Sequence, residues 1–332
     1  MSGDPRPRQL AIIGDVFCDL SATGMAGLPQ WGGDREVASP IRMLPGGSGL
    51  NSAIQLASYQ TDPARDAIAP HGAGVHTVLH AALGHDSFCD FLQDQAAAAG
   101  VDMRKISVSP EPSPDGDGRV GVQAAPGTGV CMVLSGWVDS AMSKMDRCFV
   151  THYGVVGELR AASLDVEALC AADHVHISGF YNFKNLQEDK CAGLIEVLHA
   201  CKAAGCTTSV CAQFDSSEVW GGIPELCPLM DIVFVNEDEA AAISGVAMDT
   251  VDAAAAVPAA RWFNEKGAGL AVVTLGKEGA LAMARDGGCW HQSTRMLGMD
   301  EIKDATGAGD AFIAGFLMAW LGNGGNAAGA LR

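Results

Sequence analysis

The chain has 332 residues and a mass of 34.3 kDa, enough for one large domain or two modest ones. Hydrophobic residues make up 48% of the sequence and charged residues 18%, which argues against disorder. With 21 basic and 39 acidic residues the net charge is −18, so a nucleic-acid partner is not expected. The apolar run at residues 311–321 is shorter than the ~20 residues that cross a bilayer, and the N-terminus has no signal-peptide core. We therefore expect a cytoplasmic protein without membrane contact.

Cysteine and histidine side chains do not form a metal-binding pattern in the sequence. The eleven cysteines are scattered, and no pair has the C-x-x-C spacing of zinc or redox sites. We expect them to be buried, reduced thiols. His174 and His176 alternate along an expected strand and share one face, but no third ligand accompanies them. We expect packed or exposed histidines there rather than metal ligands.

In chain order, the first half of the sequence begins with an apolar strand that ends at Gly14 and Asp15. A turn-rich stretch over residues 21–47 predicts short strands or a long loop, and residues 48–60 predict a helix entered from a glycine turn. A loop rich in proline, glycine and aspartate follows residue 108 and leads to β-like segments up to residue 137.

The second half alternates between strands and helices. Strands are expected at 174–180, 207–215, 230–236 and 270–276, and helices at 189–205, 238–245 and 259–267. This alternation predicts a parallel sheet covered by helices. Two glycine-rich, β-rich segments, about residues 20–45 and 115–150, interrupt it, and the simplest arrangement pairs them into one small second sheet.

Polar residues follow several of the expected strands. They are Asp15, Asp19, Asp215, Asn236 and Thr274 with Gly276. Each alone is typical of a turn. Because ligands of open α/β sheets bind at the carboxyl ends of the strands, their recurrence predicts a common cleft.

The most informative segment is IKDATGAGDAFIAGFLMAW, residues 302–320. Gly307, Ala308 and Gly309 precede an apolar helix, so their N–H groups and the helix N-terminus predict an anion hole. Asp310 follows in the first helical turn. Its carboxylate can cap the helix, or it can accept a proton from a hydroxyl that attacks a phosphoryl group in the hole. The spacing alone leaves both readings open.

A second glycine cluster, PGGSGLNSA, covers residues 45–53. It lacks the third glycine of a dinucleotide fingerprint and the G-x-S-x-G of a hydrolase elbow. It predicts a tight turn that lets a ligand approach the backbone, with the Asn51 amide available to hydroxyl groups.

Together, GGSGLNSA and DATGAGDAFIAGF resemble the two signatures of the ribokinase-like (PfkB) family of carbohydrate and nucleoside kinases, in the right order and separation. Further similar segments extend the resemblance over most of residues 10–320. It implies a single ribokinase-like domain over residues 1–332, with a central, mostly parallel sheet flanked by helices and a small β-sheet lid. It also implies a kinase that uses ATP and Mg²⁺ to phosphorylate a hydroxymethyl group of a sugar or sugar-like substrate.

The resemblance also implies roles for individual residues. Asp310 matches the general base, and Gly307, Ala308 and Gly309 match the anion hole. The sugar-binding positions are matched by Asp19, Gly46, Gly47 and Asn51, and the nucleotide positions by Asn236, Thr274, Gly276 and Gly279. Glu239 matches a residue that holds Mg²⁺ through water, and Asp304 matches a ligand of a monovalent cation, K⁺. The lid of this family often forms a dimer contact, so a homodimer through the lid is consistent with the resemblance.

The sequence departs from the family pattern in two informative places. Asp215 lies in DSSEVW where the family has D-x-N-x-R, so we expect it to lack a basic partner. The chain stops at GGNAAGALR, before the segment that completes the adenine pocket and cation loop in the family, so we expect a truncated C-terminal end. Two alternatives therefore stay open: a nucleoside kinase, which the sugar-kinase-like GGSGLN turn disfavours, and a non-catalytic binding or scaffold protein with this fold.

Overall fold

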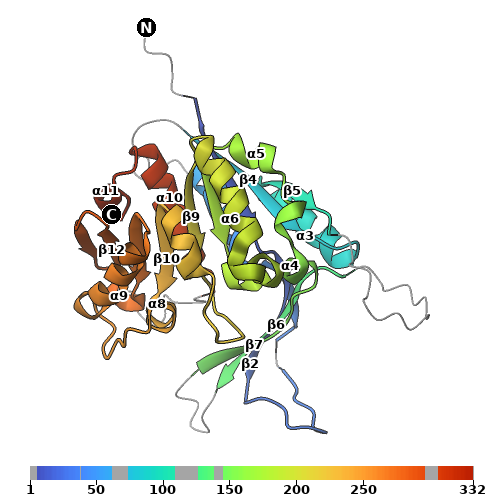
Figure 1. Ribbon diagram of the computed structural model, residues 1–332. Coiled ribbons are helices and arrows are strands. Elements are labelled where there is room, and N and C mark those ends of the chain that lie inside the picture. The colour runs from blue at the N-terminus through green and yellow to red at the C-terminus, as the bar shows by residue number, and fades with distance from the viewer. Residues whose placement is uncertain are drawn as a thin grey trace.

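A nine-stranded sheet forms the centre of the computed structural model, which describes residues 6–37, 39–61, 74–108, 126–137, 145–295 and 306–331 (Figure 1). From one edge to the other, its strands are β13 (Cys289–Gln292), β12 (Ala280–Ala284), β11 (Leu270–Thr274), β10 (Ile232–Asn236), β9 (Thr207–Cys211), β8 (His174–Ser178), β1 (Arg8–Gly14), β4 (Val75–Ala82) and β5 (Asp102–Ile106). The strands from β11 to β5 run parallel, and β12 and β13 are antiparallel. The predicted parallel sheet is confirmed.

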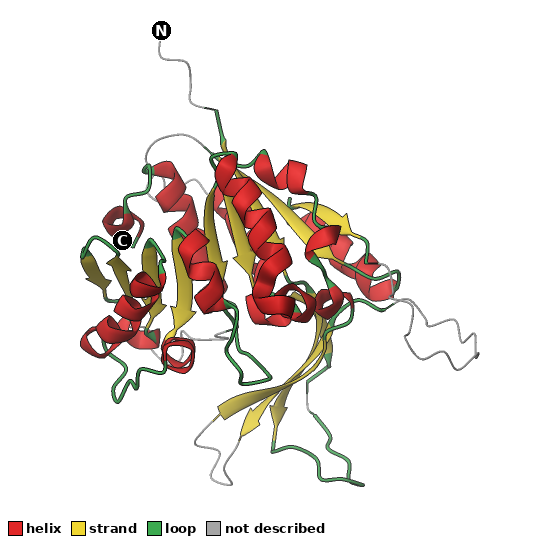
Figure 2. Ribbon diagram, viewed as in Figure 1, coloured by secondary structure: helices red, strands yellow, loops and turns green. Residues whose placement is uncertain are grey.

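Helices cover both faces of this sheet, which explains why strands such as β10 and β11 are apolar over almost their whole length (Figure 2). In β1, Ala11 and Ile13 pack into one core, while Leu10 and Ile12 pack into the core on the opposite face. One face is covered by α5 (Val166–Cys170), α6 (Glu188–Ala203), α7 (Ile223–Leu226), α8 (Glu237–Ser244) and α9 (Ala253–Lys266). The other is covered by α1 (Ser48–Thr61), α3 (Ser87–Ala98), α10 (Ala308–Gly322) and α11 (Ala327–Ala330).

A second, four-stranded sheet projects from the end of the body at which the parallel strands finish (Figure 1). Its order is β3 (Arg42–Gly46), β2 (Phe17–Met25), β6 (Val130–Trp137) and β7 (Met145–His152), and a short helix, α4 (Val155–Glu158), follows it. The two interrupting segments therefore pair into one small sheet, as predicted, although residues 109–125 and 138–144 lie outside the described part. We call this sheet the lid.

One expectation about the lid is wrong. The sequence analysis placed Asp19 at the end of the first strand of the main sheet. Instead β1 ends at Gly14, and the chain passes through Asp15 and Val16 into β2, where Asp19 pairs with Leu44 of the lid. Gly14 and Asp15, where the apolar strand was expected to end, mark the change of sheet, but apolar residues resume directly after them.

His174, His176 and most of the cysteines pack as core residues, whereas Cys289 is exposed. His174 and His176 are fully buried, and each places a ring nitrogen 2.7 Å from the Ser209 hydroxyl oxygen. Burial lowers the pKa of both rings to about 3, so they are neutral. All eleven cysteines are free thiols, and eight of them are buried. Within the described residues, no helix combines the length and the apolar character needed to span a membrane.

Candidate active site

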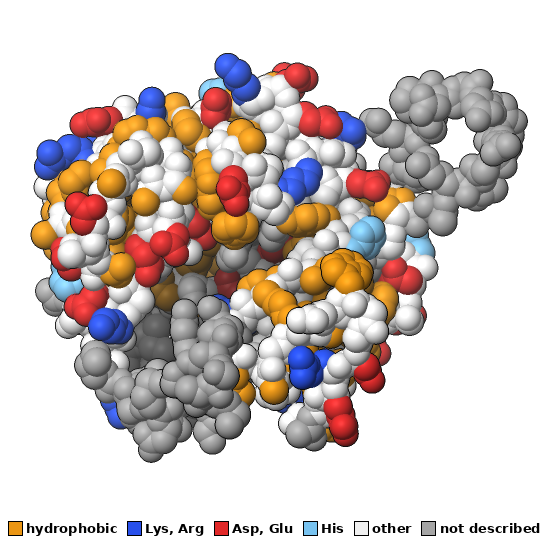
Figure 3. Space-filling view, turned by 90° about the horizontal axis from the view of Figure 1, so that it is seen from below, with side chains coloured by type: hydrophobic (Ala, Val, Ile, Leu, Met, Phe, Trp, Pro, Cys, Tyr) orange, Lys and Arg blue, Asp and Glu red, His pale blue; other side chains and the backbone are white. Residues whose placement is uncertain are grey.

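A cleft of about 390 Å³ opens between the lid and the carboxyl ends of the parallel strands. Segments far apart in sequence line it, and nine of the predicted site residues are among them: Asp19, Gly47, Asn51, Asn236, Glu239, Gly307, Ala308, Gly309 and Asp310. Figure 3 views the molecule from the lid side and shows hydrophobic side chains gathered on the lid. A separate hollow of about 350 Å³ on the lid, lined by Met25, Leu28 and Trp137, has an apolar character. The polar chemistry is therefore concentrated in the larger cleft.

Asp310 lies in the first turn of α10, and its carboxylate faces α1. Its Oδ1 accepts a hydrogen bond from the Ser48 hydroxyl at 2.6 Å, and its Oδ2 accepts one from the Asn51 amide at 2.9 Å. Within the described residues, these side chains, rather than amides of α10, are the partners of the carboxylate. Burial raises the pKa of Asp310, and the two hydrogen bonds oppose that rise. The helix-capping reading therefore loses its support, while a carboxylate that lines the cleft fits a general base.

The residues before Asp310 present backbone amides to the cleft. Gly307 has φ +78° and begins α10 as its N-cap residue, so the N–H groups of the next residues have no partner within the helix. Together with the positive end of the helix dipole they suit an anion. Arg147 of the lid donates a hydrogen bond of 3.1 Å to the Thr306 hydroxyl, directly before this turn. The lid therefore contacts the anion-hole segment.

On the lid side of the cleft, glycines make room for a carboxylate. A Cβ atom on Gly46 would lie 2.3 Å from Cγ of Asp19, so the backbone and this carboxylate are in close contact. Burial raises the pKa of Asp19 to about 6. Gly47 has φ +90°, and a Cβ there would lie 2.5 Å from the Asp15 carbonyl oxygen. The tight turn predicted from PGGSGLNSA is present, and it joins the lid to α1.

Among the cleft residues that were missed or given no role by the sequence analysis, three form hydrogen bonds around the carboxylates: Asp15, Asn182 and Ser48. Asp15 was recognised only as a residue at a strand end. It is buried, and its carboxylate accepts hydrogen bonds from the Gly49 amide at 2.8 Å and from the Asn182 side chain at 2.6 Å. Burial raises its pKa to about 7. Asn182 and Ser48 were not singled out, although Asn182 follows the strand β8 and Ser48 lies inside the glycine cluster.

Asn236 and Glu239 line the opposite side of the cleft. They form a reciprocal cap at the start of α8, in which the Asn236 side chain accepts from the Glu239 amide at 2.8 Å and Glu239 accepts from the Asn236 amide at 3.0 Å. The need to cap α8 is therefore enough to explain why Asn and Glu stand at these positions. Because both residues also line the cleft, they can contact a nucleotide as well.

The remaining nucleotide positions lie next to the cleft rather than in its lining. Thr274 is the register partner of Asn236 in the neighbouring strand, so it reaches the same edge of the sheet. Gly276 and Gly279 flank the short turn that follows. Gly279 has φ +94°, and a Cβ there would lie 1.9 Å from the Gln292 carbonyl oxygen, so packing alone requires a glycine. Asp304, the expected cation ligand, lies outside the described residues.

The acidic groups of the cleft fit Mg²⁺ held through water better than a cage of protein ligands. In the part of the chain that the structure describes, no group of three or more His, Cys, Asp or Glu side chains is arranged to hold a metal ion. Glu239 is buried, and its pKa rises to about 7 because of burial and its acidic neighbours. A cation nearby would relieve this excess of negative charge. Mg²⁺ usually keeps several waters and binds through few carboxylates plus substrate phosphates, which agrees with this arrangement.

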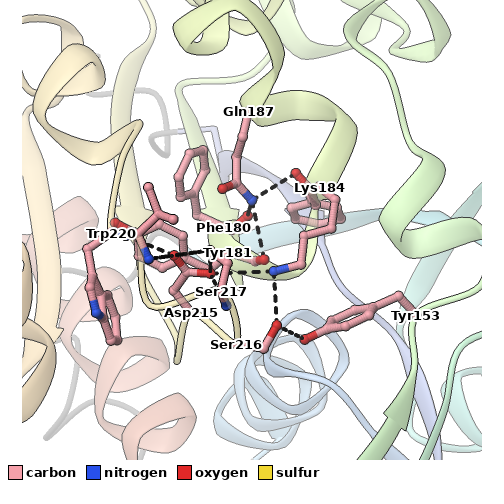
Figure 4. A network of polar contacts seen from close by, with 11 residues as sticks. Tyr153, Phe180, Tyr181, Lys184, Gln187, Asp215, Ser216, Ser217 and Trp220 are labelled. Atoms are coloured by element: carbon pink, nitrogen blue, oxygen red, sulfur yellow. Dashed lines mark hydrogen bonds and ion pairs between the residues drawn. The ribbon is translucent and has the colours of Figure 1, made fainter.

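Asp215 has the basic partner that its motif lacks, which corrects the sequence-based expectation. Lys184, from the loop after β8, places Nζ 3.5 Å from Oδ1 of Asp215 (Figure 4). The carboxylate also accepts hydrogen bonds from the amides of Ser217, Val219 and Trp220. These contacts outweigh burial and lower its pKa. The partner comes from another element, so no local motif can reveal it.

The sequence profile of the pfkB family carbohydrate kinases matches residues 138–332, more than half of the chain. The protein belongs to the PfkB family. This places it among the sugar and nucleoside kinases, which are phosphotransferases.

Individual relatives agree with this PfkB membership. The chain is 26% identical to a ribokinase of Haemophilus influenzae over 289 residues, 87% of the chain and 82% of the relative. It is 40% identical to a cytidine kinase of Thermococcus kodakarensis over 96 residues, 29% of the chain and 31% of the relative.

Solved structures confirm the ribokinase-like fold. Arabidopsis thaliana ribokinase, complexed with ribose and ATP, has a TM-score of 0.70 at 20% identity and covers 99% of this chain and 90% of its own. A putative ribokinase II from E. coli, in complex with ATP and Mg²⁺, has a TM-score of 0.66 at 22% identity, with 98% and 89% covered.

Proposed function

We propose that this protein transfers the γ-phosphoryl group of ATP to a hydroxymethyl group of a sugar, with Asp310 as the general base. The observation that carries the proposal is the position of the Asp310 carboxylate. It is buried at the cleft, beside the N-terminal amides of α10, and is bonded to Asn51 of the glycine turn. The acceptor hydroxyl, the general base and the anion hole would therefore lie next to one another in the cleft.

Each half of the cleft has a separate task in this proposal. Asp19, Asn51 and the backbone of Gly46 and Gly47 hold the sugar hydroxyls. The substrate hydroxyl then donates its proton to Asp310 while it attacks the phosphoryl group. The amides of Gly307, Ala308, Gly309 and Asp310 stabilise the charge that develops on the transferring oxygens. Phosphoryl transfer depends mainly on such positioning and charge stabilisation.

ATP and Mg²⁺ belong to the other half of the cleft. Asn236 and Glu239 would hold Mg²⁺ through water, and Mg²⁺ would neutralise the phosphate charge. Thr274, Gly276 and Gly279 would line the part of the nucleotide site that lies beyond Asn236 and Glu239. The similar structures described with ribose and ATP, or with ATP and Mg²⁺, support these ligands for the cleft as a whole. The monovalent-cation role of Asp304 stays a prediction.

The lid completes the site as part of a single domain. Its closure would exclude water and suppress ATP hydrolysis. Several apolar side chains are exposed on the lid face that points away from the cleft, among them Met43, Met132 and Val150. These support a homodimer through the lid, and the free thiols suit a reducing compartment such as the cytoplasm.

A nucleoside acceptor is the second candidate, because two aromatic side chains line the cleft without being buried. Phe149 of the lid is 52% exposed and Phe214, after β9, is 61% exposed. A flat heterocycle would cover such rings. The partial match to a cytidine kinase supports the same candidate.

The test is ADP release with Mg-ATP and K⁺ over a panel of pentoses, hexoses, polyols and nucleosides. We expect turnover with one class, reduced on the order of 10²-fold to 10⁴-fold in Asp310→Asn. The choice between free sugars and nucleosides separates the two candidates. Unchanged transfer in Asp310→Asn would overturn the assignment of the base. Nucleotide binding without turnover on any acceptor would instead support the non-catalytic alternative.

A further inference from the structure

Asp310 is the end of a chain of buried hydroxyl groups. The Ser178 hydroxyl donates to Oγ of Ser48 at 2.9 Å, and the Ser48 hydroxyl donates to Oδ1 of Asp310 at 2.6 Å. The three residues come from the end of β8, the first position of α1 and the first turn of α10. Their exposed fractions are 0%, 5% and 6%. The chain therefore joins three elements that the sequence keeps far apart.

The chemistry of the groups fixes the direction of this chain. An ionised carboxylate only accepts hydrogen bonds, so the single proton of the Ser48 hydroxyl must point to Asp310. Its oxygen is then free to accept the proton of Ser178. A hydrogen bond to a charged oxygen is shorter and stronger than one between neutral groups, which agrees with 2.6 Å against 2.9 Å.

Ser52, one turn further along α1, shows what an ordinary packing contact looks like here. It is also buried, and its hydroxyl lies 3.4 Å from the main-chain oxygen of Asp310. It joins the same two helices but does not contact the carboxylate. Ser48 therefore contacts the carboxylate of Asp310, whereas Ser52 contacts only its main-chain oxygen.

We propose that Ser48 and Ser178 are positioning residues for Asp310: they fix one carboxylate oxygen, so that the other is directed at the substrate hydroxyl. This inference rests on the proposed function. The Asn51 amide holds Oδ2 on one side, and the rest of that oxygen remains available to the acceptor in the cleft. Both oxygens are thus placed before substrate binds, which reduces the reorganisation needed during transfer.

The charges around Asp310 make these neutral donors important. The titratable and charged groups that face it in the described residues are Asp15 at the end of β1, Glu239 of α8, the thiol of Cys211 in β9, the phenol of Tyr59 in α1, and Arg147 of the lid through Thr306. Burial raises the pKa of Asp310 and so opposes its ionisation. The charge of Asp310 in turn raises the pKa values of the Asp15 and Glu239 carboxyl groups. The hydrogen bond from Ser48 favours the ionised form that a base needs.

The experiment compares Ser48→Ala and Ser178→Ala with Ser52→Ala as the matched control, using the acceptor found in the panel. We measure kcat and KM from pH 5 to 9. In Ser48→Ala, kcat should fall roughly tenfold to hundredfold with little change in the KM for the acceptor, and the acidic limb of the kcat profile should move to higher pH. Ser178→Ala should shift the limb in the same direction by less, and Ser52→Ala should resemble the wild type. Ser48→Thr keeps a hydroxyl and should restore the profile.

The outcomes separate this inference from the proposed function. If Asp310→Asn is inactive while Ser48→Ala has the profile of Ser52→Ala, only the positioning role is wrong. If Asp310→Asn keeps its turnover, the assignment of the base is wrong. If Ser48→Ala does not fold, as thermal unfolding would show, Ser178→Ala and Ser48→Thr decide in its place. An unshifted acidic limb in Ser178→Ala would then overturn the inference.

Discussion

The Asn51 side chain donates a hydrogen bond of 2.9 Å to Oδ2 of Asp310, a residue 259 positions away in the sequence. The bond connects the glycine turn at the start of α1 with the anion-hole turn at the start of α10. Because Asn51 also faces the cleft, a bound acceptor would contact both partners. Substrate binding and orientation of the base are therefore coupled through one amide.

This coupling predicts different results for two substitutions of Asn51. Asn51→Asp places a second carboxylate against Asp310, and a like charge raises the pKa of its neighbour. We expect the acidic limb of the kcat profile to move to higher pH and turnover at neutral pH to fall at least about tenfold. Asn51→Ala removes the hydrogen-bond donor without adding a charge. The acidic limb of its kcat profile should therefore move to higher pH by less than that of Asn51→Asp. Identical pH profiles for the two variants would contradict this explanation.

The contact between Gly46 and Asp19 predicts a binding defect. In Gly46→Ala the added methyl group would overlap the Asp19 carboxylate, which must then leave its place beside the turn. We expect the KM for the acceptor to rise about tenfold, the loss of roughly one charged hydrogen bond, with a smaller change in kcat. Gly74→Ala is the matched control, because a Cβ there meets no atom within 4 Å. Steady-state kinetics of both variants provide the measurement.

Much of the fold could be predicted because its signals are local. Strands covered on both faces can be apolar over almost their whole length, as in β10 and β11, and the helices between them have clear start and stop residues. The pairing of the two glycine-rich segments followed because a β-rich segment needs a partner. The position of Asp19 in the lid was missed, since apolar residues resume directly after Gly14 and Asp15 and already belong to β2.

The candidate site was predictable only where a compact motif carries it. GAGD and GGSGLN each place their residues within one turn, so Asp310 and Asn51 could be found. Ser178 meets Ser48 across 130 positions, and Lys184 meets Asp215 from another loop. Serine and lysine at those positions have no distinctive spacing. Such contacts depend on the packing of whole elements, which a single sequence does not encode in any short pattern.

The Asp215 network predicts unequal effects of its two partners on stability. Asp215→Ala would leave the backbone amides of Ser217, Val219 and Trp220 without their acceptor, so the free energy of unfolding should fall by about 3 kcal/mol. Lys184 is 34% exposed, and Lys184→Met should cost less than about 1 kcal/mol. Urea unfolding at neutral pH measures both changes. Equal losses would show that the ion pair, rather than the amide contacts, stabilises this loop.

The buried carboxylate of Asp15 predicts how stability depends on pH in the ligand-free protein. Burial raises its pKa from 3.8 to about 7, so between these values the folded chain keeps a proton that the unfolded chain has lost. The free energy of unfolding must then fall as the pH rises through this window, by on the order of 1.4 kcal/mol for each unit of pKa difference. Asp15→Asn does not titrate, so its fall should be shallower. A residual slope should remain, because the pKa values of Asp19 and Glu239 are raised in the same direction.

Urea unfolding of the wild type and of Asp15→Asn at several pH values from 4.5 to 8 tests this prediction, with the exposed Asp286→Asn as a surface control. The wild-type and Asp15→Asn curves should differ most in slope below pH 7 and run parallel above it. Parallel curves over the whole range would mean that Asp15 is ionised when folded. In that case, the hydrogen bonds from Gly49 and Asn182 outweigh the cost of burying the charge, and the cleft holds a permanent second carboxylate near Asp310.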